Sequence, residues 1–164
     1  MSTAISILTI VHVLLSLVGI GSGFIVIRGL IGSQKLESWT AIFLAATVAT
    51  SVTALMFPFG GITPGIILAM ISLVALAITI AARYKFHLAG GWRAAYVITA
   101  VLAQYLNVFV LIAQSFQKIP QLRSLAPTQA EPPFAIAQLV ALIAFLVLGV
   151  LSTLRFRPQP LQAT

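Results

Sequence analysis

The stretch FAIAQLVALIAFLVLGVLSTL, residues 134–154, contains no charged side chain and is followed directly by Arg155. An α-helix rises about 1.5 Å per residue, so a run of this length reaches across a hydrocarbon core of roughly 30 Å. The apolar residues are continuous and do not alternate with polar ones, which is typical of a helix surrounded by lipid. The stretch therefore predicts a transmembrane helix.

Four further apolar runs precede it, and together they predict an all-α fold, a polytopic transmembrane bundle of five spans. The predicted spans cover residues 4–27, 39–57, 64–82, 94–116 and 134–154 of a single domain. Residues 117–133, with four prolines, are predicted to form a loop, and residues 155–164 a tail. Thr63 is predicted to cap the third span, with Pro64 in its first position, and Glu131 to cap the fifth.

The composition agrees with burial in lipid. Hydrophobic residues make up 60% of the chain and charged residues 7%, and the mean hydropathy is +1.13. Soluble domains carry about 25% charged residues, so this chain cannot cover a water-facing surface. The lipid bilayer is the expected partner. Nucleic acid is not, because the net charge of +7 is scattered between the runs. The absence of cysteine excludes disulfides and thiolate metal sites.

The distribution of the basic residues predicts the orientation of the bundle. With the N-terminus outside, seven of the nine basic residues are cytoplasmic and two are external. The positive-inside rule therefore favours an N-out, C-in topology, with loop 117–133 external and tail 155–164 cytoplasmic. The rival arrangement has four spans, with the second and third runs forming a re-entrant pair. It is disfavoured because it places both ends of the chain on the same side.

Two stretches, TVATSVT (47–53) leading into FPF (57–59), and LAPTQAEPPF (125–134), together with His12, carry a resemblance. The chain resembles a family of small multi-pass bacterial inner-membrane proteins with no assigned function. The resemblance implies a location in the bacterial inner (cytoplasmic) membrane. It implies no activity, cofactor or catalytic residue, so the function has to be argued from the side chains.

Polar residues gather on one face of the first span. His12, Ser16, Gly19 and Gly23 follow one another at spacings of four, three and four residues. Gly19 and Gly23 form a G-x-x-x-G pair, which predicts the close approach of another helix. An ionisable residue inside a span is costly and usually faces the protein interior, so His12 is a candidate ligand contact. A structural histidine bonded to a neighbouring helix is the alternative.

The fourth span is also polar, and it brings carboxamides to the depth of His12. The candidate ligand-binding residues are His12, Ser16, Thr50, Gln104, Asn107, Gln114 and Gln138. Most of these side chains belong to the outer half of the N-out model, which predicts a polar pocket there, with His12, Gln104 and Asn107 converging in it. Hydrogen bonding between helices, without any ligand, is the other explanation for the carboxamides.

These observations favour a non-catalytic protein that binds a small or lipophilic ligand, such as a quinone, a haem or a lipid. No catalytic residue and no metal site is assigned, because the spans hold few titratable groups for acid–base chemistry. A structural or accessory subunit of a membrane complex, or a homo-oligomer using the Gly19 and Gly23 seam, is the first alternative. A small channel or transporter is the second.

Overall fold

The computed structural model describes residues 3–158, which form helices and contain no β-strand. The elements are α1 (Thr3–Ile31), α2 (Glu37–Leu55), α3 (Pro64–Ile80), the π-helix η1 (Ala81–Lys85), α4 (Gly91–Lys118), α5 (Pro120–Leu125) and α6 (Pro132–Arg155). In this part of the chain, five helices are long and apolar enough to cross a membrane: α1, α2, α3 with η1, α4 and α6. The all-helical class with five apolar helices is therefore confirmed, and it indicates a multi-pass membrane protein.

The helices are longer than the predicted spans, mainly at ends where the predicted span stopped at a basic residue. α1 continues past Arg28 to Ile31, and α4 begins at Gly91, before Arg93. Long basic side chains can reach toward water while their backbone stays helical, so a charge need not end a helix. Segment 117–133 is not wholly a loop, since it contains the short helix α5, with Pro120 in its first turn, where a missing N–H costs nothing.

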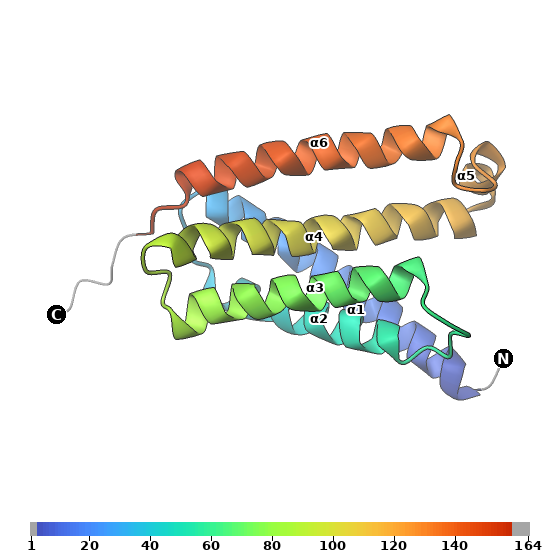
Figure 1. Ribbon diagram of the computed structural model, residues 1–164, viewed down its shortest axis with the longest axis horizontal. Coiled ribbons are helices and arrows are strands. Elements are labelled where there is room, and N and C mark those ends of the chain that lie inside the picture. Colours follow the sequence, from blue (N-terminus) through green and yellow to red (C-terminus); the bar gives the residue numbers. More distant parts are fainter. Residues whose placement is uncertain (1–2, 159–164) are drawn as a thin grey trace.

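Figure 1 shows α3, α4 and α6 side by side, with α1 and α2 behind them. α4 contacts α1, α3 and α6, and α1 packs chiefly against α2. The bundle has two ends. We call the end where α1, η1 and α6 finish the arginine end, because Arg83, Arg93 and Arg155 lie there. The opposite end, with the α2–α3 turn and α5, is the cavity end.

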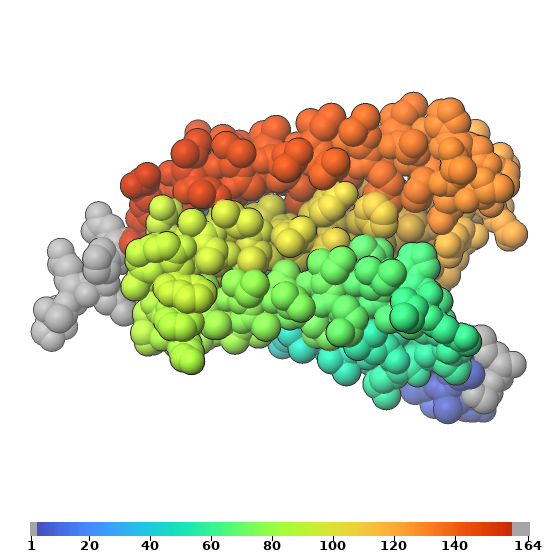
Figure 2. Space-filling view, in the orientation of Figure 1, coloured from blue at the N-terminus to red at the C-terminus, as the bar shows by residue number. Residues whose placement is uncertain are grey.

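The burial pattern suits lipid outside and packed helices inside. Buried apolar side chains join α1, α2, α3 and α4 in one core, including Leu30, Phe43, Leu76, Tyr96 and Val97. Many large apolar side chains point outward instead, and α6 buries only Ala141, Phe145 and Ser152. Figure 2 shows α6 along the upper edge of the bundle, beside α4. Such exposure is costly in water and favourable in a bilayer.

The two predicted helix starts turn out differently. Thr63 caps α3 as expected, since its Oγ1 accepts a hydrogen bond of 3.3 Å from the backbone N–H of Ile66. Glu131 occupies the N-cap position of α6, but its carboxylate makes no bond to that helix. Pro132 and Pro133 remove the first N–H groups that it could have met. The carboxylate turns back and accepts from Thr128 and Ala130 in the preceding loop.

Candidate ligand-binding site

A cavity of about 540 Å³ lies between α1, α2, α3 and α4, toward the cavity end. Its walls are mostly apolar, with Val13, Leu17, Ala69 and Leu106 among the contributors. The polar side chains that line it are Thr9, His12, Ser16, Thr50, Ser51, Ser72, Asn107, Gln114, Ser115 and Lys118. Small-molecule sites in proteins are typically apolar cavities of this size with a few converging polar groups.

Five of the candidate residues named from the sequence lie around this cavity, namely His12, Ser16, Thr50, Asn107 and Gln114. They come from three helices that adjoin in the bundle. Gln104 and Gln138 do not line it. The expected convergence of His12, Gln104 and Asn107 is therefore wrong for Gln104.

Gln104 is fully buried at the contact of α4 with α1. Its Nε2 donates a hydrogen bond of 2.8 Å to the carbonyl oxygen of Ile20. A Cβ atom added at Gly23 would overlap the Gln104 side chain, with its Nε2 only 2.9 Å away. Because Gly23 leaves this space empty, the carboxamide fills it and bonds to α1 without reaching the cavity. Its Oε1 has no hydrogen-bond partner within residues 3–158.

Gln138 connects α6 to α4. Its Nε2 donates a hydrogen bond of 3.1 Å to the carbonyl oxygen of Phe109. α6 packs on the side of α4 that faces away from the cavity, where a second, almost wholly apolar hollow of about 530 Å³ lies between Val101, Tyr105 and Phe145. The sequence indicated a similar depth for Gln138 but could not indicate which side of α4 the last helix would cover.

Asn107 meets α2 beside the first glycine of the G-x-x-x-G pair. Its Nδ2 donates to Thr47 Oγ1 at 3.3 Å. A Cβ atom at Gly19 would lie 3.1 Å from the same Oγ1 and 3.7 Å from Asn107 Nδ2. Gly19 thus admits α2, and Gly23 admits α4. Both glycines pack against helices of this chain, so neither is left for the face of a second molecule.

His12 is half-buried, and its ring lies among groups of the second helix and the turn after it. The Nδ1 atom is 2.9 Å from Thr53 Oγ1. The ring of Phe57 meets the imidazole edge-on, with centroids 5.5 Å apart. His12 and Asn107 of the fourth span line the same cavity, as expected, but the side chain that bonds to His12 is Thr53 of the second helix. α2 takes that role because it is the closest neighbour of α1.

Two hydroxyls at the cavity lack hydrogen bonds. Thr50 Oγ1 and Ser72 Oγ are buried and have no partner within residues 3–158, and Ser72 is only 4% exposed. Buried polar groups are nearly always paired with protein or water, so unpaired hydroxyls on two residues that line a cavity are candidates for pairing with a bound molecule. Ser72 was not among the residues singled out from the sequence, because an isolated serine in a transmembrane helix is weak evidence.

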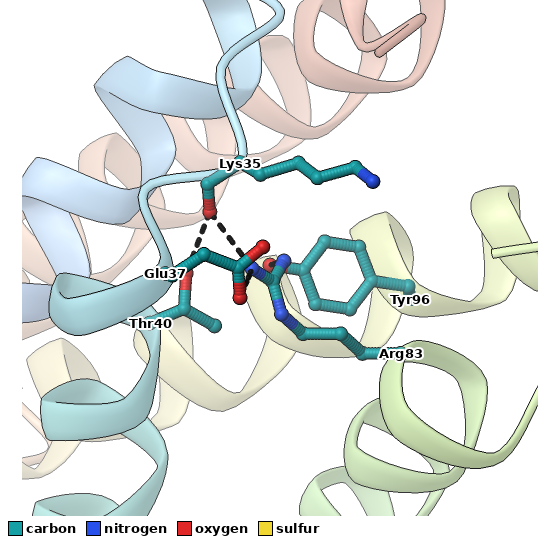
Figure 3. A network of polar contacts seen from close by, with 5 residues as sticks. All are labelled: Lys35, Glu37, Thr40, Arg83 and Tyr96. Atoms are coloured by element: carbon teal, nitrogen blue, oxygen red, sulfur yellow. Dashed lines mark hydrogen bonds and ion pairs between the residues drawn. The ribbon is translucent and has the colours of Figure 1, made fainter. Parts of the chain in front are cut away.

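A second polar cluster lies at the arginine end, outside the cavity (Figure 3). Arg83, on η1, is 5% exposed. Its guanidinium lies 2.9 Å from the Glu37 carboxylate and donates to Tyr96 Oη and to the Lys35 carbonyl oxygen, both at 3.0 Å. Thr40 donates to the same carbonyl at 3.1 Å. These bonds join the α1–α2 connection, α2, η1 and α4.

In the sequence, Arg83 is evident only as a charge that sets topology, and this cluster was not predicted. A signal existed, since Glu37 is the one acidic residue that the sequence places at the same predicted side. Arg93 acts similarly nearby. Its Nη1 donates to the carbonyl oxygens of Thr153 and Phe156, at 3.2 and 2.6 Å, and so ties the end of α6 to α4. These contacts are structural and leave the cavity as the candidate site.

Residues 3–158 contain no group of three or more His, Asp or Glu side chains able to hold a metal ion. Comparison of the chain with protein-family models, with curated proteins and with solved structures finds no match. The candidate site therefore stands on its own geometry.

Proposed function

We propose that this chain is a multi-pass protein of the bacterial inner membrane that holds a small amphiphilic molecule in the cavity between α1, α2, α3 and α4. The observation that carries the proposal is the unpaired hydroxyl of Ser72, together with that of Thr50, at the wall of a cavity of about 540 Å³. An amphiphile would give these hydroxyls a partner and fill the apolar remainder. The role is binding, without catalysis.

A quinone or a lipid suits this lining better than a haem does. His12 is the single imidazole at the cavity, and its Nδ1 already has a neighbour in Thr53. A haem with two histidine ligands cannot form there, since His87 lies in the connection between η1 and α4 at the opposite end of the bundle. Quinones and lipids need only hydrogen bonds at the head and apolar walls around the tail.

Mass spectrometry of the protein purified in mild detergent tests the binding of an endogenous molecule. We expect a quinone or lipid to co-purify in a stoichiometric amount. Ala69→Phe should expel it, because Ala69 is buried at the cavity wall. Ala144→Phe is the matched control, since Ala144 is exposed on α6 and should leave the bound molecule in place. Equal retention by both variants, or no bound molecule in the parent protein, would contradict the proposal.

The proposed orientation is N-out and C-in, which puts the cavity in the external half of the bilayer. Its support is the charge count, with seven basic residues toward the arginine end and only Lys118 and Arg123 toward the other. A reporter fused after residue 164 should read as cytoplasmic, and one inserted between Pro120 and Pro127 as external. An external C-terminus would exclude this topology.

An accessory subunit is the second candidate, and α6 is the observation that favours it. α6 buries few residues and lies beside an apolar hollow against α4. A partner helix could cover that face, although lipid covers it equally well. Native mass spectrometry in lipid discs separates the candidates, since a monomer with a bound small molecule supports the first and a defined oligomer without one supports the second.

A further inference from the structure

The proposed function does not specify the chemistry of the bound molecule's head group. The hydrogen bonds of Thr53 limit which head groups fit beside His12. Thr53 Oγ1 lies 2.8 Å from the carbonyl oxygen of Ala49 and 3.0 Å from that of Thr50, as well as 2.9 Å from His12 Nδ1. A hydroxyl has one proton, and carbonyl oxygens only accept. If the proton pointed at His12, the Thr53 oxygen would face two carbonyl oxygens at short range without a proton between them.

The hydroxyl of Thr53 therefore donates to its own helix, as threonines in helices commonly do. Its oxygen is then an acceptor for His12, so the proton of the neutral imidazole resides on Nδ1. The tautomer of a histidine is set in this way by the bond that one nitrogen makes. The other nitrogen, Nε2, then keeps its lone pair, and because His12 lines the cavity, Nε2 is the ring atom that can accept a hydrogen bond from a bound molecule.

The cavity is thus lined by an imidazole acceptor and by the residues of two unpaired hydroxyls, beside further polar residues that include Asn107, Gln114 and Lys118. His12 Nε2 can only accept a hydrogen bond, whereas Thr50 and Ser72 can donate one. A head group that satisfies both kinds must itself donate and accept, as a hydroxyl does. A ketone or an ether oxygen accepts only and leaves Nε2 unpaired. Phe57 and Phe59 also line the cavity, with centroids 6.1 Å apart, and offer ring faces and edges to an aromatic head.

We propose that the cavity binds an amphiphile whose head is a phenol or hydroquinone, with the phenolic O–H donating to His12 Nε2 and the apolar tail lying along α1 and α4. This proposal rests on the proposed function, because it takes the cavity as a binding site. It also makes a statement about His12 that holds without any ligand, namely that Thr53 fixes the proton on Nδ1.

The tautomer is measured first, by ¹⁵N NMR of the histidine side chain in lipid discs. The chain has two histidines, so His87→Gln leaves His12 as the only signal. We expect a protonated Nδ1 and an unprotonated Nε2 in this protein. Thr53→Ser should leave this tautomer unchanged, and Thr53→Val should alter it, because valine removes the acceptor. An unprotonated Nδ1 in the protein with Thr53 intact would overturn the proposed phenolic head group. It would leave the proposed binding function of the cavity untouched.

Binding of 4-decylphenol and of its methyl ether, 4-decylanisole, to the His87→Gln protein then tests the head group. The two probes differ in a single donor proton. We expect the phenol to bind roughly three- to tenfold more tightly, the effect of one hydrogen bond, and this preference to vanish in Thr53→Val and persist in Thr53→Ser. Equal affinities in the parent protein would overturn the phenolic head but not the proposed function. If neither probe binds, and Ala69→Phe does not change the retention of the endogenous molecule, both the phenolic head group and the proposed function are overturned.

Discussion

The two ends of the bundle differ in whether their buried polar groups have hydrogen-bond partners. At the arginine end, the guanidinium of Arg83 meets a carboxylate, a phenol and a backbone carbonyl, and Arg93 holds two carbonyls of the last helix. At the cavity end, Thr50 and Ser72 line the cavity, and their buried hydroxyls have no partner within residues 3–158. Ser152 is the exception at the arginine end, since its buried hydroxyl has no partner within residues 3–158.

The difference separates stability from binding. Satisfied polar networks stabilise a fold, and removal of one member leaves the others unpaired. An unpaired buried hydroxyl lowers stability, and this cost is removed when a bound molecule pairs with the hydroxyl. Substitutions at the arginine end should therefore change the free energy of unfolding, and substitutions at the cavity should change ligand retention.

The largest effect is expected between the two ends, at Gly23. Gly23→Leu should lower the free energy of unfolding by about 3 kcal/mol, because the new side chain would occupy the place of Gln104. Gly21→Leu is the matched control two residues away, since no atom outside its own helix surroundings lies within 4 Å of a Cβ there. Reversible unfolding in detergent measures both. Equal tolerance of the two changes would mean that α4 does not lie on α1 at this glycine.

Arg83→Met should have the next largest effect, a loss of about 2 kcal/mol of unfolding free energy. The loss arises from the buried Tyr96 hydroxyl, which loses its bond from Arg83, and from the Lys35 carbonyl, which keeps only its bond from Thr40. The ion pair itself contributes little, because Glu37 is 69% exposed and screened by solvent. Arg123→Met, on the exposed surface of α5, is the control. A bound molecule that is lost from Arg83→Met at temperatures where the protein stays folded would show that the two ends are not independent.

A pair of threonines gives a direct comparison of the ends. Thr79 is buried and bonded to Thr99 at 2.7 Å, so Thr79→Val should cost about 1 kcal/mol of unfolding free energy. Thr50→Val removes a buried hydroxyl without a partner and should leave that free energy unchanged or raise it, by at most about 1 kcal/mol. Only Thr50→Val should reduce ligand retention. The comparison fails if both variants destabilise the protein equally.

The smallest effect concerns the loop before α6. Desolvation raises the pKa of Glu131, but hydrogen bonds from Thr128 and Ala130 together outweigh it, so folding lowers this pKa below its ordinary value. Loop stabilisation is therefore present above the ordinary pKa of a glutamate and is lost as the pH falls through the lower, folded pKa. Hydrogen exchange of the Thr128 and Ala130 amides should accelerate over that acidic range, and Glu131→Gln should remove the pH dependence.

The sequence predicted the helices well because a long apolar run has one stable form in lipid. Thr63 and Pro64 likewise act within one turn, so the start of α3 could be predicted locally. Glu131 shows the limit of this reasoning, since the two prolines that favour a helix start also removed the N–H groups for its carboxylate. Its bonds to Thr128 and Ala130 depend on how the loop folds back.

The candidate site could be predicted only in part, because helical spacing shows which residues share a face but not which helix that face meets. Gln104 and Asn107 are three residues apart on α4, yet one bonds to α1 and the other to α2. Arg83 and Glu37 are far apart in the sequence, and only the docking of η1 on α2 brings them together. Ser72 becomes notable only once its surroundings are known.

The attachment of α6 has a consequence for the order of assembly. Most of the buried core lies in α1, α2, α3 and α4, and α6 adds Phe145 to it, besides the Gln138 bond toward the cavity end and the Arg93 bonds at the arginine end. The cavity, in contrast, is lined by the first four helices and the α2–α3 turn, with no residue of α6, so its walls can form while the ribosome is still making α6. α6 joins as a late addition that closes no part of the binding site, so a chain cut in the loop before Pro132 should still insert and should still hold its ligand.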